Sequence, residues 1–127
     1  MTAHRVFKTR HFQRWMRKTE LTDDLLLEAV LEMAAGLVDA DLGCGVLKKR
    51  IGLAGRGKSG GVRTLVATRR ESKWFFVFGF EKNDRANISA DELAALQELA
   101  AELLTRTDAQ LRLALMDGTL QETAHER

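Results

Sequence analysis

The stretch GLAGRGKSGGVRTLVAT, residues 52–68, decides the fold of this chain. Its first eight residues match the phosphate-binding pattern G-x-x-x-x-G-K-S, which works only where a helix follows the loop and offers backbone N–H groups to the anion. Here Gly60 and Gly61 follow, which start helices poorly, and then valines and threonines, which favour strands. A strand over residues 62–68 is therefore predicted and a nucleotide-binding P-loop is rejected. The glycine-rich loop instead delivers Arg63 onto the start of that strand.

The segments around this strand predict the other elements. Strands are expected at residues 5–9, 46–51 and 74–80, and the last of these, WFFVFGF, is apolar enough to be covered on both faces. Residues 10–18 and 25–37 have helical periodicity. Two further helices are expected to begin after Ser89 and Thr107, because Glu92 and Gln110 complete capping boxes there. We therefore expect one α+β domain over residues 1–127, with a small, mainly antiparallel sheet packed against helices.

Composition narrows the classes of protein that fit. The chain has 127 residues, of which 45% are hydrophobic and 30% charged, as expected of one soluble globular domain. It has one cysteine, Cys44, which leaves no partner for an internal disulfide and fits the cytoplasm. The three histidines have no ligand spacing for zinc, so we expect neither a metal nor a cofactor. No apolar run is long enough to cross a membrane, and none resembles a signal peptide.

The charges are separated along the chain, although the net charge is only +2. Residues 1–18 hold six bases and no acid, and residues 46–73 hold nine bases and one acid. Residues 20–45, by contrast, hold seven acids and no base. Bases gathered on one part of a small domain suit a polyanion such as RNA or DNA. The alternative interpretation is a set of solvated charges without a partner.

Two motifs resemble a known family. The run GKSGGVRT at residues 57–64, an apolar strand pair, and the run GFEKNDRANISADEL at residues 79–93 resemble the RelE-type toxins of bacterial toxin–antitoxin modules. Within the RelE/ParE superfamily, the chain is most similar to the phage-associated RelE branch. The order of elements matches from about residue 6 to residue 120. The resemblance implies a RelE-like toxin core at about residues 6–104, followed by a helical C-terminal extension over residues 105–127.

The resemblance also implies an activity and its partners. RelE-type toxins cut messenger RNA in the ribosomal decoding site without a metal, and a cognate antitoxin neutralises them. Such cleavage needs a base for the 2′-hydroxyl, cations for the charge on the phosphorane, and an acid for the leaving oxygen. Arg63 matches the strand arginine of the family that contacts the scissile phosphate. The remaining catalytic candidates are Lys58, Lys82 and Arg85, and the candidates for substrate binding are Lys48, Lys49, Arg50 and Arg56.

Some features depart from the family pattern and leave alternatives open. The chain has no tyrosine, although several RelE-type toxins stack one on the substrate base. Trp15, Trp74 or Phe80 could take that place, but each is expected in the core. The general base and acid therefore stay open. The alternative function is a ParE-like toxin that binds and poisons DNA gyrase without cleaving RNA, and a third is an RNA- or protein-binding module that has lost toxicity.

Overall fold

The sheet is the centre of the fold, and the strand that carries Arg63 lies inside it. A computed structural model describes residues 4–53 and 57–123. In this part of the chain, four consecutive strands lie between two pairs of helices, and one strand stands at each end. The elements are β1 (Arg5–Thr9), α1 (Arg10–Met16), α2 (Asp23–Ala34), β2 (Ala40–Asp41), β3 (Val46–Leu53), β4 (Gly57–Thr68), β5 (Lys73–Glu81), α3 (Ala90–Leu104), α4 (Asp108–Asp117) and β6 (Leu120–Thr123).

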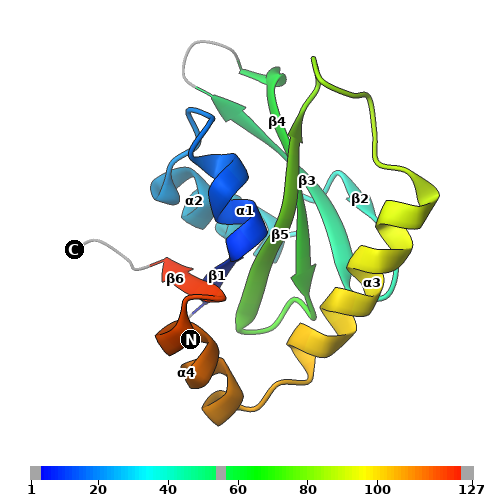
Figure 1. Cartoon of the computed structure of the whole chain (residues 1–127). Coiled ribbons are helices and arrows are strands. Elements are labelled where there is room, and N and C mark those ends of the chain that lie inside the picture. Colours follow the sequence, from blue (N-terminus) through cyan, green and yellow to red (C-terminus); the bar gives the residue numbers. More distant parts are fainter. Residues whose placement is uncertain (1–3, 54–56, 124–127) are drawn as a thin grey trace.

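The strands form one sheet in the order β2-β3-β4-β5-β1-β6 (Figure 1). Strand β1 pairs in parallel with β5, and every other neighbouring pair is antiparallel. The hairpin between β4 and β5 is the one expected at residues 69–73. This topology confirms the predicted fold class, an α+β protein with a mainly antiparallel sheet.

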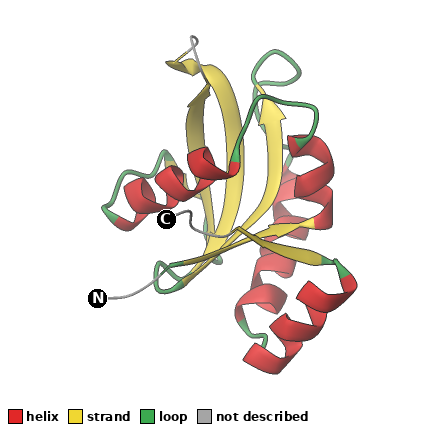
Figure 2. Cartoon of the chain, turned by 90° about the vertical axis from the view of Figure 1, so that its left-hand side faces the viewer, coloured by secondary structure: helices red, strands yellow, loops and turns green. Residues whose placement is uncertain are grey.

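Helices cover both faces of the sheet (Figure 2). One buried cluster joins α1 and α2 to one face, and a second joins α3 and α4 to the other. Alternate residues of β5 divide between them: Trp74 and Phe76 belong to the first cluster, and Phe75 and Val77 to the second. The sequence WFFVFGF therefore forms a central strand with two buried faces, as predicted.

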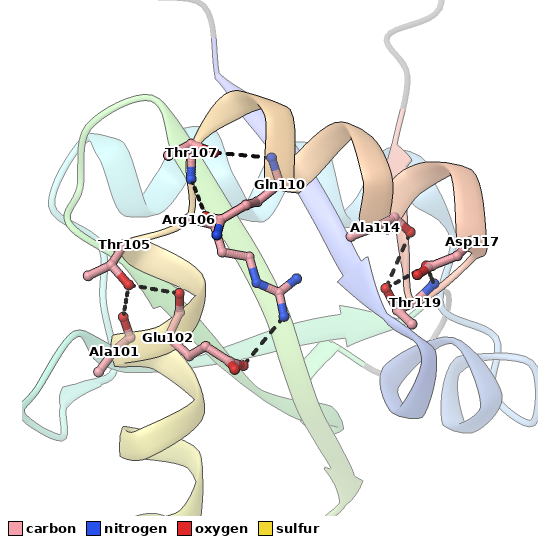
Figure 3. Close-up of polar contacts among 9 residues, drawn as sticks. All are labelled: Ala101, Glu102, Thr105, Arg106, Thr107, Gln110, Ala114, Asp117 and Thr119. Atoms are coloured by element: carbon pink, nitrogen blue, oxygen red, sulfur yellow. Dashed lines mark hydrogen bonds and ion pairs between the residues drawn. The ribbon is translucent and has the colours of Figure 1, made fainter.

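The caps predicted from the sequence set the helix starts. Thr22 caps α2, and capping boxes begin α3 at Ser89 and α4 at Thr107. In Figure 3, the Thr107 backbone N–H donates to the Gln110 side chain at 2.8 Å, and Thr107 Oγ1 accepts from the Gln110 backbone at 3.1 Å. Gly118 ends α4 in the left-handed conformation, with φ of 82°.

Three elements differ from the sequence-based expectation. Strand β4 begins at Gly57, so no helix follows the G-K-S tripeptide and the P-loop stays rejected. The short strand β2, which precedes β3, was not among the expected strands. Beyond α4, where a helical extension was expected, Leu120–Thr123 forms β6 and pairs with β1. Four residues, LQET, carry little strand signal, so pairing with β1 and burial of Leu120 decide their conformation.

Candidate nucleic-acid interface

Arg63 lies in the middle of the sheet, opposite Arg50 of β3 and Phe80 of β5. Its neighbours Val62 and Val66 belong to the cluster under α1 and α2, whereas Leu65 belongs to the cluster under α3 and α4. Because side chains alternate along a strand, Arg63 lies on the α3 side of the sheet. Strand β4 has neighbours on both sides, so this side chain is held deep in the protein.

Arg63 differs from the other buried cations in having no charged partner among the residues that the structure describes. The buried charged side chains of the described residues are Lys8, Lys49 and Arg63. The ammonium of Lys8 lies 2.7 Å from Asp23, and that of Lys49 lies 2.8 Å from Glu32. Arg63 exposes 7% of its surface, and its Nη1 has no hydrogen-bond partner among the described residues. A buried cation without a partner carries a large desolvation cost, which an anionic ligand would offset.

Arg50 supplies a second cation beside Arg63. Its Nε donates to Asp39 Oδ1 at 3.0 Å, and its backbone N–H donates to Asp39 Oδ2 at 2.6 Å. Burial alone would raise the pKa of Asp39, but the hydrogen bonds and charge of Arg50 hold that pKa below its ordinary value. Asp39 thus stays ionised and orients Arg50, whose side chain is 44% exposed and open to a ligand. Lys48 lies on the same face as Arg50 by alternation and is half-buried.

Lys49 does not join this group. Its side chain points to the opposite face, where its Nζ donates to the backbone carbonyl of Leu37 at 3.0 Å in addition to its pairing with Glu32. It joins β3 to α2 and is 2% exposed. Successive side chains of a strand point to opposite faces, so the three consecutive cations of β3 cannot share one face. This alternation was the signal in the sequence that Lys49 would lie on the opposite face from Lys48 and Arg50.

Of the remaining sequence candidates, Lys82 and Arg85 lie in the connection that follows β5. The end of β3, the start of β4 and the connection from β5 to α3 lie at the same end of the molecule (Figure 1). Lys82 and Arg85 are exposed in that connection, and Arg85 pairs with Glu92. The pKa of Glu92 is lowered, first by the hydrogen bond from Arg85 and then by the Ser89 backbone. Lys58 lies in β4, but its side chain is outside what the structure describes, and Arg56 lies outside the described residues.

A cavity of about 630 Å³ opens beside β5 and brings in residues that the sequence analysis did not select. Strand β1 pairs with β5 only as far as Phe76, so the second half of β5 is free on that side and α1 packs there. Helix α1 contributes His11, Arg14, Trp15 and Lys18 to the cavity wall. The signal for these residues was the basic helix predicted at residues 10–18, with Trp15 on its apolar side.

The aromatic side chains considered for base stacking have different surroundings. Trp74 and Phe80 are buried, as expected, and Trp74 Nε1 donates to His4 Nδ1 at 3.1 Å. Trp15 is half-buried and lines the cavity. Among the residues that the structure describes, no group of three or more His, Cys, Asp or Glu side chains could hold a metal ion. No helix in residues 4–53 and 57–123 has the length and apolar character to cross a membrane.

The fold and the site together define a class. A small α+β protein with a buried arginine that lacks an acidic partner among the described residues, beside a second arginine on the next strand, has a site suited to an anion. The model of the family described as "RelE toxin of RelE / RelB toxin-antitoxin system" matches residues 4–123. The chain therefore belongs to the RelE toxin family, and its membership implies an antitoxin partner. A search of curated proteins gives no match. Placement in the phage-associated branch stays a prediction.

Proposed function

We propose that this RelE-family toxin is an mRNA endoribonuclease that cleaves ribosome-bound message in the cytoplasm without a metal and thereby inhibits translation. The observation that carries the proposal is Arg63, a cation that is 7% exposed and has an unpartnered Nη1 on the face of the sheet that it shares with Arg50. Like charges directly opposite in a sheet repel one another. A bound phosphate would relieve that repulsion and supply the missing hydrogen-bond acceptor.

The proposed chemistry is attack of a ribose 2′-oxygen on the adjacent phosphorus. The P–O5′ bond breaks, and the products are a 2′,3′-cyclic phosphate and a 5′-hydroxyl. Arg63 would hold the charge that builds on the phosphorane oxygens, with Arg85 as a second cation from the β5–α3 connection. Lys58 and Lys82 are the candidates for moving protons to and from the reacting oxygens. Arg50, Lys48 and Arg56 would hold the flanking backbone, whereas Lys49 is left out because it binds α2.

The test is a cleavage assay with a matched pair of variants. Purified protein is added to messenger RNA with and without ribosomes, and new 5′ ends are mapped by primer extension. Arg63→Met removes the buried cation, and Arg112→Met removes an exposed cation from α4 as the control. We expect cuts on ribosome-bound message, an unchanged rate for Arg112→Met, and a rate reduced by about 100-fold or more for Arg63→Met.

Two further results would separate the mechanisms. A 2′,3′-cyclic phosphate on the upstream fragment, and loss of cutting when the scissile nucleotide is 2′-deoxy, are expected for attack by the 2′-oxygen. A 5′-phosphate on the downstream fragment would contradict that chemistry. An intact message in the presence of folded wild-type protein would refute the nuclease assignment, and DNA supercoiling by gyrase would then test the ParE-like alternative.

A further inference from the structure

The cavity beside β5 has the composition of a site for one nucleotide. It has a volume of about 630 Å³, within the range of small-ligand sites, and opens between α1 and the second half of β5. Its wall combines aromatic rings, positive charges and two carboxylates, from Asp84 and Glu92. The inference below rests on the proposed cleavage of RNA and concerns what this cavity adds to it.

Flat aromatic surfaces line the cavity. The ring of His11 stacks on that of Phe78, with 5.4 Å between centroids and 7° between planes. The guanidinium carbon of Arg85 lies 5.7 Å from the centre of the same Phe78 ring. Trp15 packs directly on the backbone at Gly79, where an added Cβ would lie 2.2 Å from the indole ring. Unpaired RNA bases stack on such aromatic and guanidinium planes.

Cations that lack partners stand at the rim of the cavity. Arg14 and Lys18 are exposed, and neither makes an ion pair or side-chain hydrogen bond within the part of the chain that the structure describes. Both line the cavity, whose other arginine, Arg85, pairs with Glu92. A neighbouring hollow along α3, of about 410 Å³, shares His11, Phe78 and Glu92 with the cavity, but the rest of its wall is mostly apolar. Its one arginine, Arg106, pairs with Glu102 at 3.4 Å. A base with a phosphate attached therefore fits the cavity better than an apolar ligand does.

The cavity also adjoins the Arg63 site. Phe80 lines the cavity and lies directly opposite Arg63 in the sheet, on the same face. Phe78, the stacking residue, is two positions along β5, about 7 Å away. RNA whose scissile phosphate lies at Arg63 would therefore have a neighbouring nucleotide within reach of the cavity.

We propose that the cavity between α1 and β5 binds the base of a nucleotide next to the scissile phosphate, and that it sets the base preference of cleavage. His11, backed by Phe78, forms the stacking surface, and Arg14 and Lys18 hold the attached phosphate. Asp84 and Glu92 accept hydrogen bonds from base N–H groups. This arrangement replaces the stacking tyrosine that the chain lacks.

The test uses variants of exposed residues on one helix, so that folding is preserved. His11→Ala and Arg14→Ala alter the cavity, and Arg17→Ala removes a cation of the same helix that does not line it. Two measurements are made: the base composition around mapped cut sites, and the Kd of RNA tetranucleotides that carry each base in turn at one position. Binding is measured by calorimetry in the Arg63→Met background, with DNA tetranucleotides of the same sequence in parallel.

We expect wild-type cavity residues to give one preferred base. His11→Ala and Arg14→Ala should each raise the Kd of that tetranucleotide about tenfold and flatten the base composition at cut sites, whereas Arg17→Ala should change neither. Unchanged preference and unchanged Kd in the two cavity variants, with cutting intact, would overturn the nucleotide site and leave the nuclease assignment standing. The nucleotide site would also be overturned if the two cavity variants differed from wild type only in escaping neutralisation by the antitoxin. The cavity would then be a protein-docking surface.

A wild-type protein that cuts no message would refute the nuclease assignment separately. In that case the tetranucleotide Kd values still test whether the cavity binds a nucleotide. Base-selective binding that depends on His11 and Arg14 would support it as a nucleotide site. Equal Kd values for all tetranucleotides in wild type and variants would overturn it.

Discussion

At the scale of single residues, the buried cations show which charges hold the fold together and which are free to act. The positive charges of Lys8 and Lys49 are each neutralised by a carboxylate of α2, so both side chains join the sheet to that helix. Arg63 is buried to a similar degree, and its Nη1 lacks any partner in the described residues. Burying an unpaired charge lowers the stability of the folded state. A ligand that is absent when the protein folds alone would explain why an unpaired arginine is buried at position 63.

This contrast predicts opposite effects on stability. Arg63→Met keeps most of the side-chain volume and removes an unpaired charge, so the free energy of unfolding should rise by about 1 kcal/mol. Lys49→Met should lower it by about 2 kcal/mol, because the Leu37 carbonyl and the Glu32 carboxylate each lose a donor. Urea unfolding followed by circular dichroism measures both. A loss of stability in Arg63→Met as large as that in Lys49→Met would assign Arg63 to the fold instead of the site.

At the scale of elements, local signals predicted most of the helices and strands. The side chains of Thr22, Ser89 and Thr107 accept hydrogen bonds from the first turn of the helices that follow them. Neighbouring residues in the sequence therefore specify where these helices begin. The conformation of Leu120–Thr123 depends on β1, more than a hundred positions away, and no local pattern reports it. The same limit applies to the site. The sequence selected Arg63 and Arg50, but the cavity residues of α1 reach β5 only because β1 ends at Thr9.

The pair of Asp39 and Arg50 predicts a pH dependence for the junction between β2 and β3. The folded-state pKa of Asp39 is lowered against the opposing effect of burial, because Arg50 donates from its backbone and its guanidinium. A lowered folded pKa gives stability that is present above the unfolded value, about 3.8, and is lost as the pH falls through the folded value. Asp39→Asn should therefore be less stable than wild type at pH 7, by about 1 kcal/mol.

That difference in the free energy of unfolding should narrow as the pH falls below 4, since wild-type Asp39 then becomes protonated. Urea unfolding of both proteins between pH 2.5 and pH 7 measures it. Asp41→Asn is the control, because Asp41 forms an ion pair with the exposed Arg70 at 3.4 Å and accepts from the Gly43 backbone N–H at 3.0 Å, a hydrogen bond that Asn can keep. A constant gap between Asp39→Asn and wild type across the whole range would contradict the role given to the Asp39 charge.

At the scale of the whole molecule, the proposed site and the last strand of the chain lie in different parts of the sheet. Helices α1 and α2 cover one face and α3 and α4 the other, so the sheet is buried on both sides (Figure 2). The cations of the proposed site belong to β3, β4 and the connection from β5 to α3. Strand β6 lies at the other side of the sheet, next to the first strand of the chain. The residues proposed to bind RNA are therefore separated from β6, which we expect to contribute to stability alone.

This separation predicts that β6 can be weakened without loss of cleavage specificity. Strand β6 pairs with β1, and Arg5 adds two hydrogen bonds to Glu122 at 2.9 Å and 3.0 Å. Leu120 is buried in the cluster under α3 and α4, whereas Gln121 is exposed. Leu120→Ala should lower the free energy of unfolding by about 2–3 kcal/mol, and Gln121→Ala should change it by less than about 0.5 kcal/mol.

Hydrogen exchange would locate the effect, with faster exchange expected first at the β1 and β6 amides of Leu120→Ala. At a temperature where the variant stays folded, its pattern of cut sites should match that of wild type, since Arg63 and the cavity beside β5 are untouched. If Leu120→Ala instead changed which bases are cut while its β1 amides stayed protected, β6 would act on the site directly. The assignment of β6 to stability alone would then fail.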